Sequence, residues 1–187
     1  MNPVAKSKTY HMILCALFAA LIAVGAFIRV PIPPMSFTMQ TFFVSLAGML
    51  LGKKYGAASA LLYLFIGLVG LPVFTQGGGI GYVFQPSFGY LIGFVVGAFV
   101  TGTIARKVPR PSFKRLLASA FAGLGVIYTC GTVYFYFLSN FYLGSPVGAW
   151  TALLYCFLVF IPGDGVMSVI AALVARRMIP LLDKNRL

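Results

Sequence analysis

Long apolar runs, separated by short polar or basic stretches, are the feature of this sequence that most constrains its fold. Six such segments can be marked, at residues 10–28, 37–51, 55–74, 86–105, 116–141 and 147–174. Most of them approach the roughly 20 residues that an α-helix needs to cross the hydrocarbon core of a bilayer. A transmembrane β-barrel would instead show short segments of alternating apolar and polar residues. The sequence therefore predicts an all-α integral membrane protein, with six spans in a single membrane domain at 1–187.

The composition excludes a water-soluble fold, because hydrophobic residues make up 60% of the chain and charged residues only 9%. Soluble domains carry about 25% charged residues.

Proline marks two interruptions of the apolar segments, since it cannot continue the hydrogen-bond ladder of a helix. The proline-rich stretch 30–36 is predicted to end the first span, and Pro162-Gly163 is predicted to kink the sixth.

The net charge of +12 reflects membrane topology rather than a nucleic-acid partner. Nucleic-acid-binding domains gather their cations on one patch or stripe, whereas here they form small clusters between apolar runs. The clusters are Lys6 and Lys8; Lys53 and Lys54; Arg106, Lys107, Arg110, Lys114 and Arg115; and Arg176, Arg177, Lys184 and Arg186. Six spans place all of these clusters on one side and only Arg29 on the other. The positive-inside rule then predicts that both termini are cytoplasmic.

Asp164 is the most informative single residue, because the chain has only two acidic residues and this one lies inside the sixth apolar run. An acid at the centre of a membrane helix costs about 2.5–3.5 kcal/mol on insertion scales and usually marks a functional or paired site. Asp164 could also cap backbone N–H groups freed by the Pro-Gly break. These two roles are compatible, since broken helices often line binding sites in membranes.

Four neutral residues on the outer side are candidates for lining a binding pocket. Tyr82, Gln85 and Tyr90 belong to the glycine- and aromatic-rich stretch between the third and fourth spans, and Gln40 begins the second span. Aromatic walls with a few neutral hydrogen-bonding groups suit a small, partly apolar ligand. Glycines in the same stretch would let the backbone approach that ligand. Gln40 could instead make an interhelical hydrogen bond.

Arg29 is the one cation on the predicted outer side. It could be an interfacial residue whose long side chain reaches the headgroup region. It could equally pair with Asp164 or bind a ligand carboxylate through its planar guanidinium. The sequence leaves these three roles open.

The first span has small residues four apart on two faces, Ala16 with Ala20 and Ala19 with Ala23. Small residues at this spacing allow close contact between helices. Such a contact could be internal packing or the docking of a partner subunit.

Catalytic and metal sites are not indicated. The chain has one histidine and two acids, too few for a metal site or a Ser-His-Asp triad, and no phosphate-binding Walker motif. We therefore expect no enzyme activity, no metal and no cofactor, and ATP hydrolysis would need partner subunits.

Over nearly its whole length, the chain resembles the BioY family, the biotin-specific binding (S) components of energy-coupling factor (ECF) transporters. The resemblance rests on ALFAA at 16–20, FTMQTFFV at 37–44, GKKYGA at 52–57, GLPVF at 70–74, FGYLIGF at 88–94 and FIPGD at 160–164. It implies a six-helix S-component bundle in a bacterial cell membrane, with biotin bound near the outer face beneath the loops after the first and third spans. It also implies a membrane-embedded coupling protein and two cytoplasmic ATPases as partners, with Ala16 and Ala20 docking on the coupling protein and Asp164 as the family aspartate.

Two positions depart from the family pattern. The family's last helix usually reads Asp-x-x-Lys, and here Met167 takes the lysine position; QPSFGY at 85–90 replaces the usual Gly-Pro-Thr-Gly-Gly-Tyr. Either Arg29 substitutes for the lysine or the ligand differs from biotin. The alternatives are therefore an S component for lipoate or a related carboxylate, a solitary carrier or channel, and, less in keeping with the residues, a small membrane enzyme.

Overall fold

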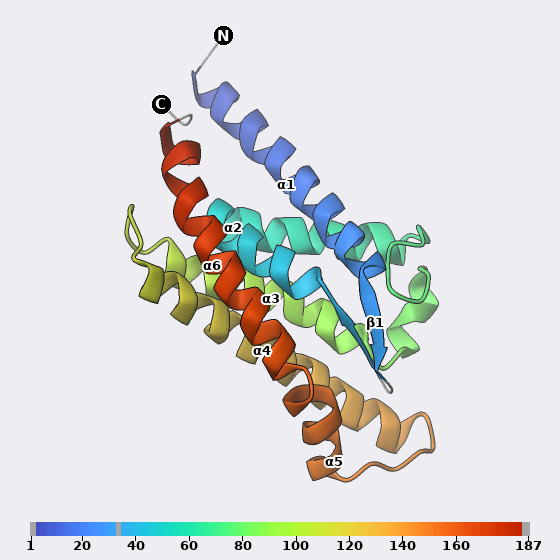
Figure 1. The fold of residues 1–187 in the computed structure, drawn as a ribbon. Helices are drawn as coiled ribbons and strands as arrows, with labels where there is room; N and C mark the ends of the chain where they lie inside the picture. The colour runs from blue at the N-terminus through green and yellow to red at the C-terminus, as the bar shows by residue number, and fades with distance from the viewer. Residues whose placement is uncertain (1–2, 33–34, 185–187) are drawn as a thin grey trace.

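The computed structural model describes residues 3–32 and 35–184, which form a bundle of long helices (Figure 1). The elements are α1 (Pro3–Phe27), β1 (Arg29–Ile32), β2 (Met35–Thr38), α2 (Gln40–Leu68), the 3₁₀ turn η1 (Ile80–Phe84), α3 (Phe88–Ala105), α4 (Phe113–Phe141), α5 (Ala149–Leu153), the π-helical turn η2 (Leu154–Leu158) and α6 (Ile161–Lys184). Within the described residues, five helical segments are long and apolar enough to cross a membrane. The predicted helical membrane class agrees with this architecture.

Helix α2 takes in most of the second and third predicted segments, but it begins at Gln40 rather than 37 and ends at Leu68 rather than 74. It folds back on itself at Gly52. Gly52 has φ 81° and ψ −179°, outside the helical region. The side-chain Nε2 of Gln40 donates to the hydroxyl of Tyr63 at 2.7 Å, although 23 residues separate them. In a straight helix those residues would lie about 35 Å apart, at 1.5 Å per residue. The two halves of α2 therefore run antiparallel, as Figure 1 shows, and the turn falls where the sequence predicted a break.

The first half of α2 forms the centre of the bundle. Every residue from Val44 to Leu51 is buried. Glycines bring the neighbouring helix α3 close: a Cβ on Gly48 would lie 2.7 Å from the backbone oxygen of Ala98, and a Cβ on Gly102 would collide with the backbone of Lys53. Small residues at helix contacts allow this close packing.

The sixth predicted segment is interrupted close to the expected place. Helix α5 and the turn η2 form its first part, and α6 then begins as a separate helix at Ile161. Pro162 and Gly163 occupy the first turn of α6 rather than a kink within it. Proline is tolerated there, because the first helical N–H groups have no intrahelical acceptor. Helix α6 also continues to Lys184, beyond the predicted end at residue 174.

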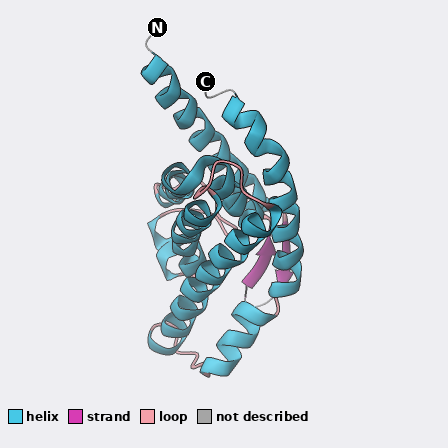
Figure 2. Cartoon of the chain, turned by 90° about the vertical axis from the view of Figure 1, so that its left-hand side faces the viewer, coloured by secondary structure: helices cyan, strands magenta, loops and turns pink. Residues whose placement is uncertain are grey.

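The strands β1 and β2 form an antiparallel hairpin that the all-α prediction missed (Figure 2). Its register pairs Arg29 with Thr38 and Pro31 with Ser36. A sheet of two strands has only edge strands, so Pro31 can sit in β1 without breaking a central ladder. Figure 1 places the start of α1 and the end of α6 at one end of the bundle and the strands β1 and β2 towards the other.

Candidate functional site

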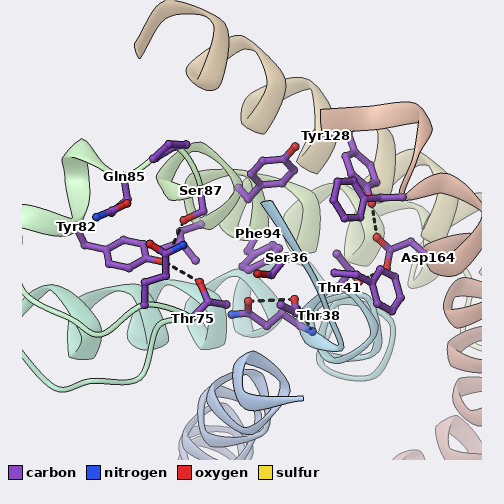
Figure 3. Close-up of a pocket in the computed structure, with 17 residues that line it drawn as sticks. Ser36, Thr38, Thr41, Thr75, Tyr82, Gln85, Ser87, Phe94, Tyr128 and Asp164 are labelled. Carbon is purple, nitrogen blue, oxygen red and sulfur yellow. Dashed lines mark hydrogen bonds between the residues drawn. The ribbon is translucent and has the colours of Figure 1, made fainter. Parts of the chain in front are cut away.

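A cavity lies among the hairpin, the loop after α2, and the ends of several helices (Figure 3). Its lining residues are Ser36, Phe37, Thr38, Gln40, Thr41, Thr75, Gln76, Tyr82, Gln85, Pro86, Ser87, Tyr90, Leu91, Phe94, Tyr128, Phe160 and Asp164. Five of the six predicted ligand-binding residues are among them, and Arg29 is not. A second hollow, on the face of α3 and α4, is lined by Gly89, Ile92, Cys130, Val133, Tyr134 and Phe137. It offers few polar groups, so the first cavity is the candidate site.

Polar side chains gather at two ends of this cavity. Figure 3 places Thr41, Tyr128 and Asp164 together on one side, which we call the carboxylate end. Thr75, Tyr82, Gln85 and Ser87 lie on the other side, which we call the hydroxyl end. Phe94 lies between the two ends together with Ser36 and Thr38, and Leu91 and Phe160 add apolar lining. The cavity therefore suits a small, partly apolar ligand that presents polar groups to both ends.

Asp164, in the first turn of α6, is only 3% exposed. The hydroxyl of Thr41 donates to its Oδ1 at 2.5 Å, and the hydroxyl of Tyr128 donates to its Oδ2. These donors come from α2 and α4, so the carboxylate links three helices rather than capping its own backbone through its side chain. A carboxylate has about four acceptor positions. Two are used here, which leaves capacity for N–H donors of a ligand.

Gln40, also 3% exposed, both lines the cavity and joins the two halves of α2. Its Nε2 donates to the Tyr63 hydroxyl, which in turn donates to the backbone oxygen of Val73 at 3.1 Å. Its Oε1 accepts from the hydroxyl of Thr38 at 3.2 Å. The interhelical hydrogen bond and the pocket position are therefore both present.

At the hydroxyl end, hydrogen bonds join three side chains in a row. The Tyr82 hydroxyl lies 2.8 Å from the hydroxyl oxygen of Thr75 and 3.0 Å from that of Ser87. Ser87 immediately precedes α3, and Gln85 lies two residues before Ser87.

Tyr90, in the first turn of α3, donates its hydroxyl to the backbone oxygen of Cys156. Tyr90 therefore contributes mainly its ring to the cavity wall.

The glycines of the loop after α2 shape the turn rather than the cavity surface. Gly79 has φ 99° and ψ 165°, a conformation that residues with a side chain rarely adopt. A Cβ on Gly78 would collide with the backbone oxygen of Leu71. Neither glycine lines the cavity, so the prediction that these glycines let the backbone approach a ligand does not match their positions.

Arg29 lies outside the cavity lining, at the start of β1. Its side chain is exposed, and its Nη1 donates to the backbone oxygen of Thr75. The predicted pairing with Asp164 is not observed, because Thr41 and Tyr128 are the side-chain partners of that carboxylate. Its predicted role towards a ligand carboxylate stays a prediction.

Sequence reasoning missed Thr41, Thr75 and Tyr128, and it did not single out Ser87 within the stretch 77–90 that it expected to line a ligand. Thr41 and Tyr128 lie within long apolar runs, where a hydroxyl is a weak signal. Their importance comes from meeting Asp164 across 123 and 36 residues of sequence, respectively. A polar residue inside a membrane span commonly bonds across helices, and this rule could have brought Tyr128 into consideration.

The two small-residue pairs of α1 face different environments. Ala16 and Ala20 are exposed, together with their neighbour Leu17. Ala19 is buried, and Ala23 is half-buried. The Ala19–Ala23 pair therefore faces internal packing, whereas Ala16 and Ala20 lie on a surface available to lipid or a partner subunit.

Comparisons with known proteins agree with this architecture. A crystal structure described as the S-component for biotin from an ECF-type ABC transporter superposes with a TM-score of 0.82 at 29% identity, covering 92% of each chain. A probable biotin transporter BioY from Lysinibacillus sphaericus is 44% identical, over 97% of this chain and 92% of the relative. The biotin transporter BioY of Thermotoga maritima is 43% identical, over 90% of this chain and 95% of the relative. Residues 1–184 match the BioY family, and the chain therefore belongs to that family.

Proposed function

We propose that this chain is the biotin-binding subunit of an ATP-driven vitamin importer of the ECF type. The observation that carries the proposal is the cavity, where a buried carboxylate and a group of neutral hydroxyls and amides face each other across apolar walls. The names of its relatives and of the similar crystal structure, as biotin transporters and a biotin S-component, support the choice of ligand.

Biotin fits the chemistry of the carboxylate end. Its ureido ring carries two N–H donors, and the unused acceptor positions of Asp164 suit them. Hydrogen bonds to a charged acceptor are roughly twice as strong as neutral ones. The donors from Thr41 and Tyr128 hold the carboxylate in place. The carboxylate therefore loses little orientational freedom when a ligand binds. Phe94, Leu91 and the ring of Tyr90 would contact the thiophane ring and the hydrocarbon chain.

The carboxylate of biotin would then lie towards the hydroxyl end. Among the described residues that line the cavity, none is a lysine or an arginine, and Met167 occupies the position of the family lysine. The hydroxyls of Thr75, Tyr82 and Ser87 and the amide of Gln85 are neutral partners that a carboxylate can use.

We infer that the chain, as a single membrane domain, crosses a bacterial plasma membrane six times with both termini in the cytoplasm. The two antiparallel halves of α2 would supply two of the crossings. Basic residues support the orientation, because a Cβ on Gly52 would lie 3.7 Å from the Arg106 side chain. The clusters at 53–54 and 106–115 therefore begin at one end of the bundle, as the positive-inside rule requires.

A membrane-embedded coupling protein and two cytoplasmic ATPases would be the transport partners. Ala16 and Ala20 supply an exposed small-residue surface on α1 for the coupling protein. Replacing both with leucine should leave biotin binding unchanged but abolish uptake into vesicles that contain the complete transporter. The matched control is the pair Ala19 and Ala23, where leucine should disturb folding because Ala19 is buried. Unchanged uptake by the Ala16/Ala20 variant would remove these residues from the interface.

Equilibrium binding to the detergent-purified chain tests the ligand. We expect biotin to bind tightly, lipoate to compete poorly, and Asp164→Asn to weaken binding. Asp183→Asn is the matched control, since it neutralises the only other acidic residue of the chain. A folded sample that prefers lipoate would reassign the ligand within the same architecture. Uptake by vesicles that lack coupling subunits would instead support a solitary carrier.

A further inference from the structure

Two segments distant in sequence form part of the cavity wall, and Arg29 joins them. The first is the hairpin β1–β2, from which Ser36, Phe37 and Thr38 line the cavity. The second is the loop at 69–79, from which Thr75 and Gln76 line it.

Each segment also has anchors of its own. The backbone N–H of Gly79 donates to the oxygen of Gly67 at 2.7 Å, which fixes the loop to the end of α2. The backbone N–H of Met39, just after the hairpin, lies 3.2 Å from the oxygens of Gly25 and Ile28. Among the hydrogen bonds of the described residues, the contact between Arg29 and the Thr75 backbone oxygen is the one that joins hairpin to loop.

We propose that Arg29 is a latch, a positioning residue that holds the hairpin β1–β2 against the loop 69–79 and slows ligand exchange without contacting the ligand. Its guanidinium is charged under all ordinary conditions and makes a charge-assisted hydrogen bond to the Thr75 oxygen. Arg29 pairs in register with Thr38, a lining residue. Breaking the contact therefore frees the hairpin to move relative to the loop, while each segment keeps its own anchors. The proposal rests on the proposed function only in using biotin as a probe.

Dissociation rates of biotin and of its neutral amide, biotinamide, separate a latch from a ligand partner. In Arg29→Gln we expect both ligands to dissociate about fivefold faster, the effect of losing an exposed hydrogen bond that contributes ~1 kcal/mol. Arg29→Lys should recover part of the slow dissociation, because an ammonium group can also donate to the carbonyl. Lys54→Gln removes a cation next to the turn at Gly52 and should change neither rate.

Two results with these ligands would overturn the latch. Faster dissociation of biotin alone, with biotinamide unaffected, would make Arg29 a direct partner of the biotin carboxylate. Unchanged dissociation of both ligands from a folded Arg29→Gln protein would mean that the hairpin and loop stay closed without the contact. Thermal unfolding of each variant identifies any that is misfolded.

A labelling experiment tests the latch without any ligand. Ser87 lines the cavity, and Ser87→Cys places a thiol there with little change in volume. Mass spectrometry would follow maleimide labelling of residue 87, which we expect to be about fivefold faster when Arg29→Gln is added. Equal labelling rates would refute the latch. Failure of the parent protein to bind biotin would refute only the proposed ligand, since labelling still reports opening of the cover.

Discussion

The carboxylate end of the cavity is built on helices, whereas the hydroxyl end is built on connecting segments. Thr41, Tyr128 and Asp164 lie on α2, α4 and α6 and are tied directly to one another. Thr75 lies in a loop, Tyr82 in the five-residue turn η1, and Ser87 just before α3. Helix backbones hold side chains more precisely than loops do, and loops open locally at lower free-energy cost.

This difference suggests a division of roles between the two ends. The carboxylate end can recognise a ligand with a preformed arrangement of acceptors, which lowers the ordering cost of binding. The hydroxyl end can complete the contacts after entry and then release the ligand. Substitutions at the first end should mainly change affinity or stability, and substitutions at the second should mainly change exchange rates.

The largest effect is expected from Gly52→Ala, which strains the turn that packs the two halves of α2. The conformation of Gly52 is nearly restricted to glycine, and forcing another residue into it costs about 1–3 kcal/mol. We expect a clearly lower melting temperature in detergent. Gly125→Ala is the control, because nothing lies within 4 Å of a Cβ there and alanine favours a helix. Equal melting temperatures for the two variants would show that the turn tolerates a side chain.

Tyr128→Phe should have the next largest effect. It removes one of the two hydroxyls that orient Asp164 and leaves the ring packing intact. We expect biotin affinity to fall about tenfold, in line with a hydrogen bond to a charged group. Isothermal titration calorimetry would measure the change. An unchanged dissociation constant would mean that Thr41 alone holds the carboxylate.

Gly79→Ala places the same kind of backbone strain in the cover of the cavity (the loop 69–79) rather than in the helical scaffold, where Gly52 lies. The loop can relax locally, so we expect a smaller loss of melting temperature than in Gly52→Ala. Biotin dissociation should become faster by about threefold. Local relaxation of the loop absorbs part of the roughly 1–3 kcal/mol of strain, so only the remainder changes the dissociation rate. A fall in melting temperature as large as that of Gly52→Ala would contradict the distinction between cover and scaffold.

Tyr82→Phe should have the smallest effect and is the matched partner of Tyr128→Phe. It removes a hydroxyl that contacts Thr75 and Ser87, both neutral groups. Neutral hydrogen bonds contribute about 0.5–1.5 kcal/mol, and the flexible surroundings can compensate. We expect an affinity loss of about threefold, expressed mainly in the dissociation rate. A loss greater than that of Tyr128→Phe would reverse the assigned importance of the two ends.

Much of the fold could be predicted because the bilayer imposes a length and a composition on each span. The boundary at Gly52-Lys53-Lys54 was found because glycine and two cations interrupt an apolar run. The hairpin was missed because its prolines indicated a turn, and pairing between two short strands leaves little trace in sequence. The sequence predicted a kink at Pro162-Gly163, where a new helix in fact begins, because proline can end a helix or begin one.

The site was predictable where a residue was unusual for its surroundings. Asp164 stands out as an acid in an apolar run, and Gln40 and Gln85 stand out as amides. Thr41 and Tyr128 do not stand out, since their role depends on helices meeting in space. Arg29 stood out as a charge, but the acceptor that it contacts is a backbone oxygen, which no sequence pattern reveals.

The burial of Val44 to Leu51 also bears on how the protein is assembled in the membrane. The first half of α2, residues 40–51, is about 18 Å long at 1.5 Å per residue, much less than the roughly 30 Å of the hydrocarbon core. It is therefore a poor candidate for insertion by itself. We expect it to enter the bilayer together with the second half, as a helical hairpin. The first half of α2 then stays in contact with lipid until α3 packs against it. The centre of the finished bundle would therefore be completed only after later segments have been synthesised.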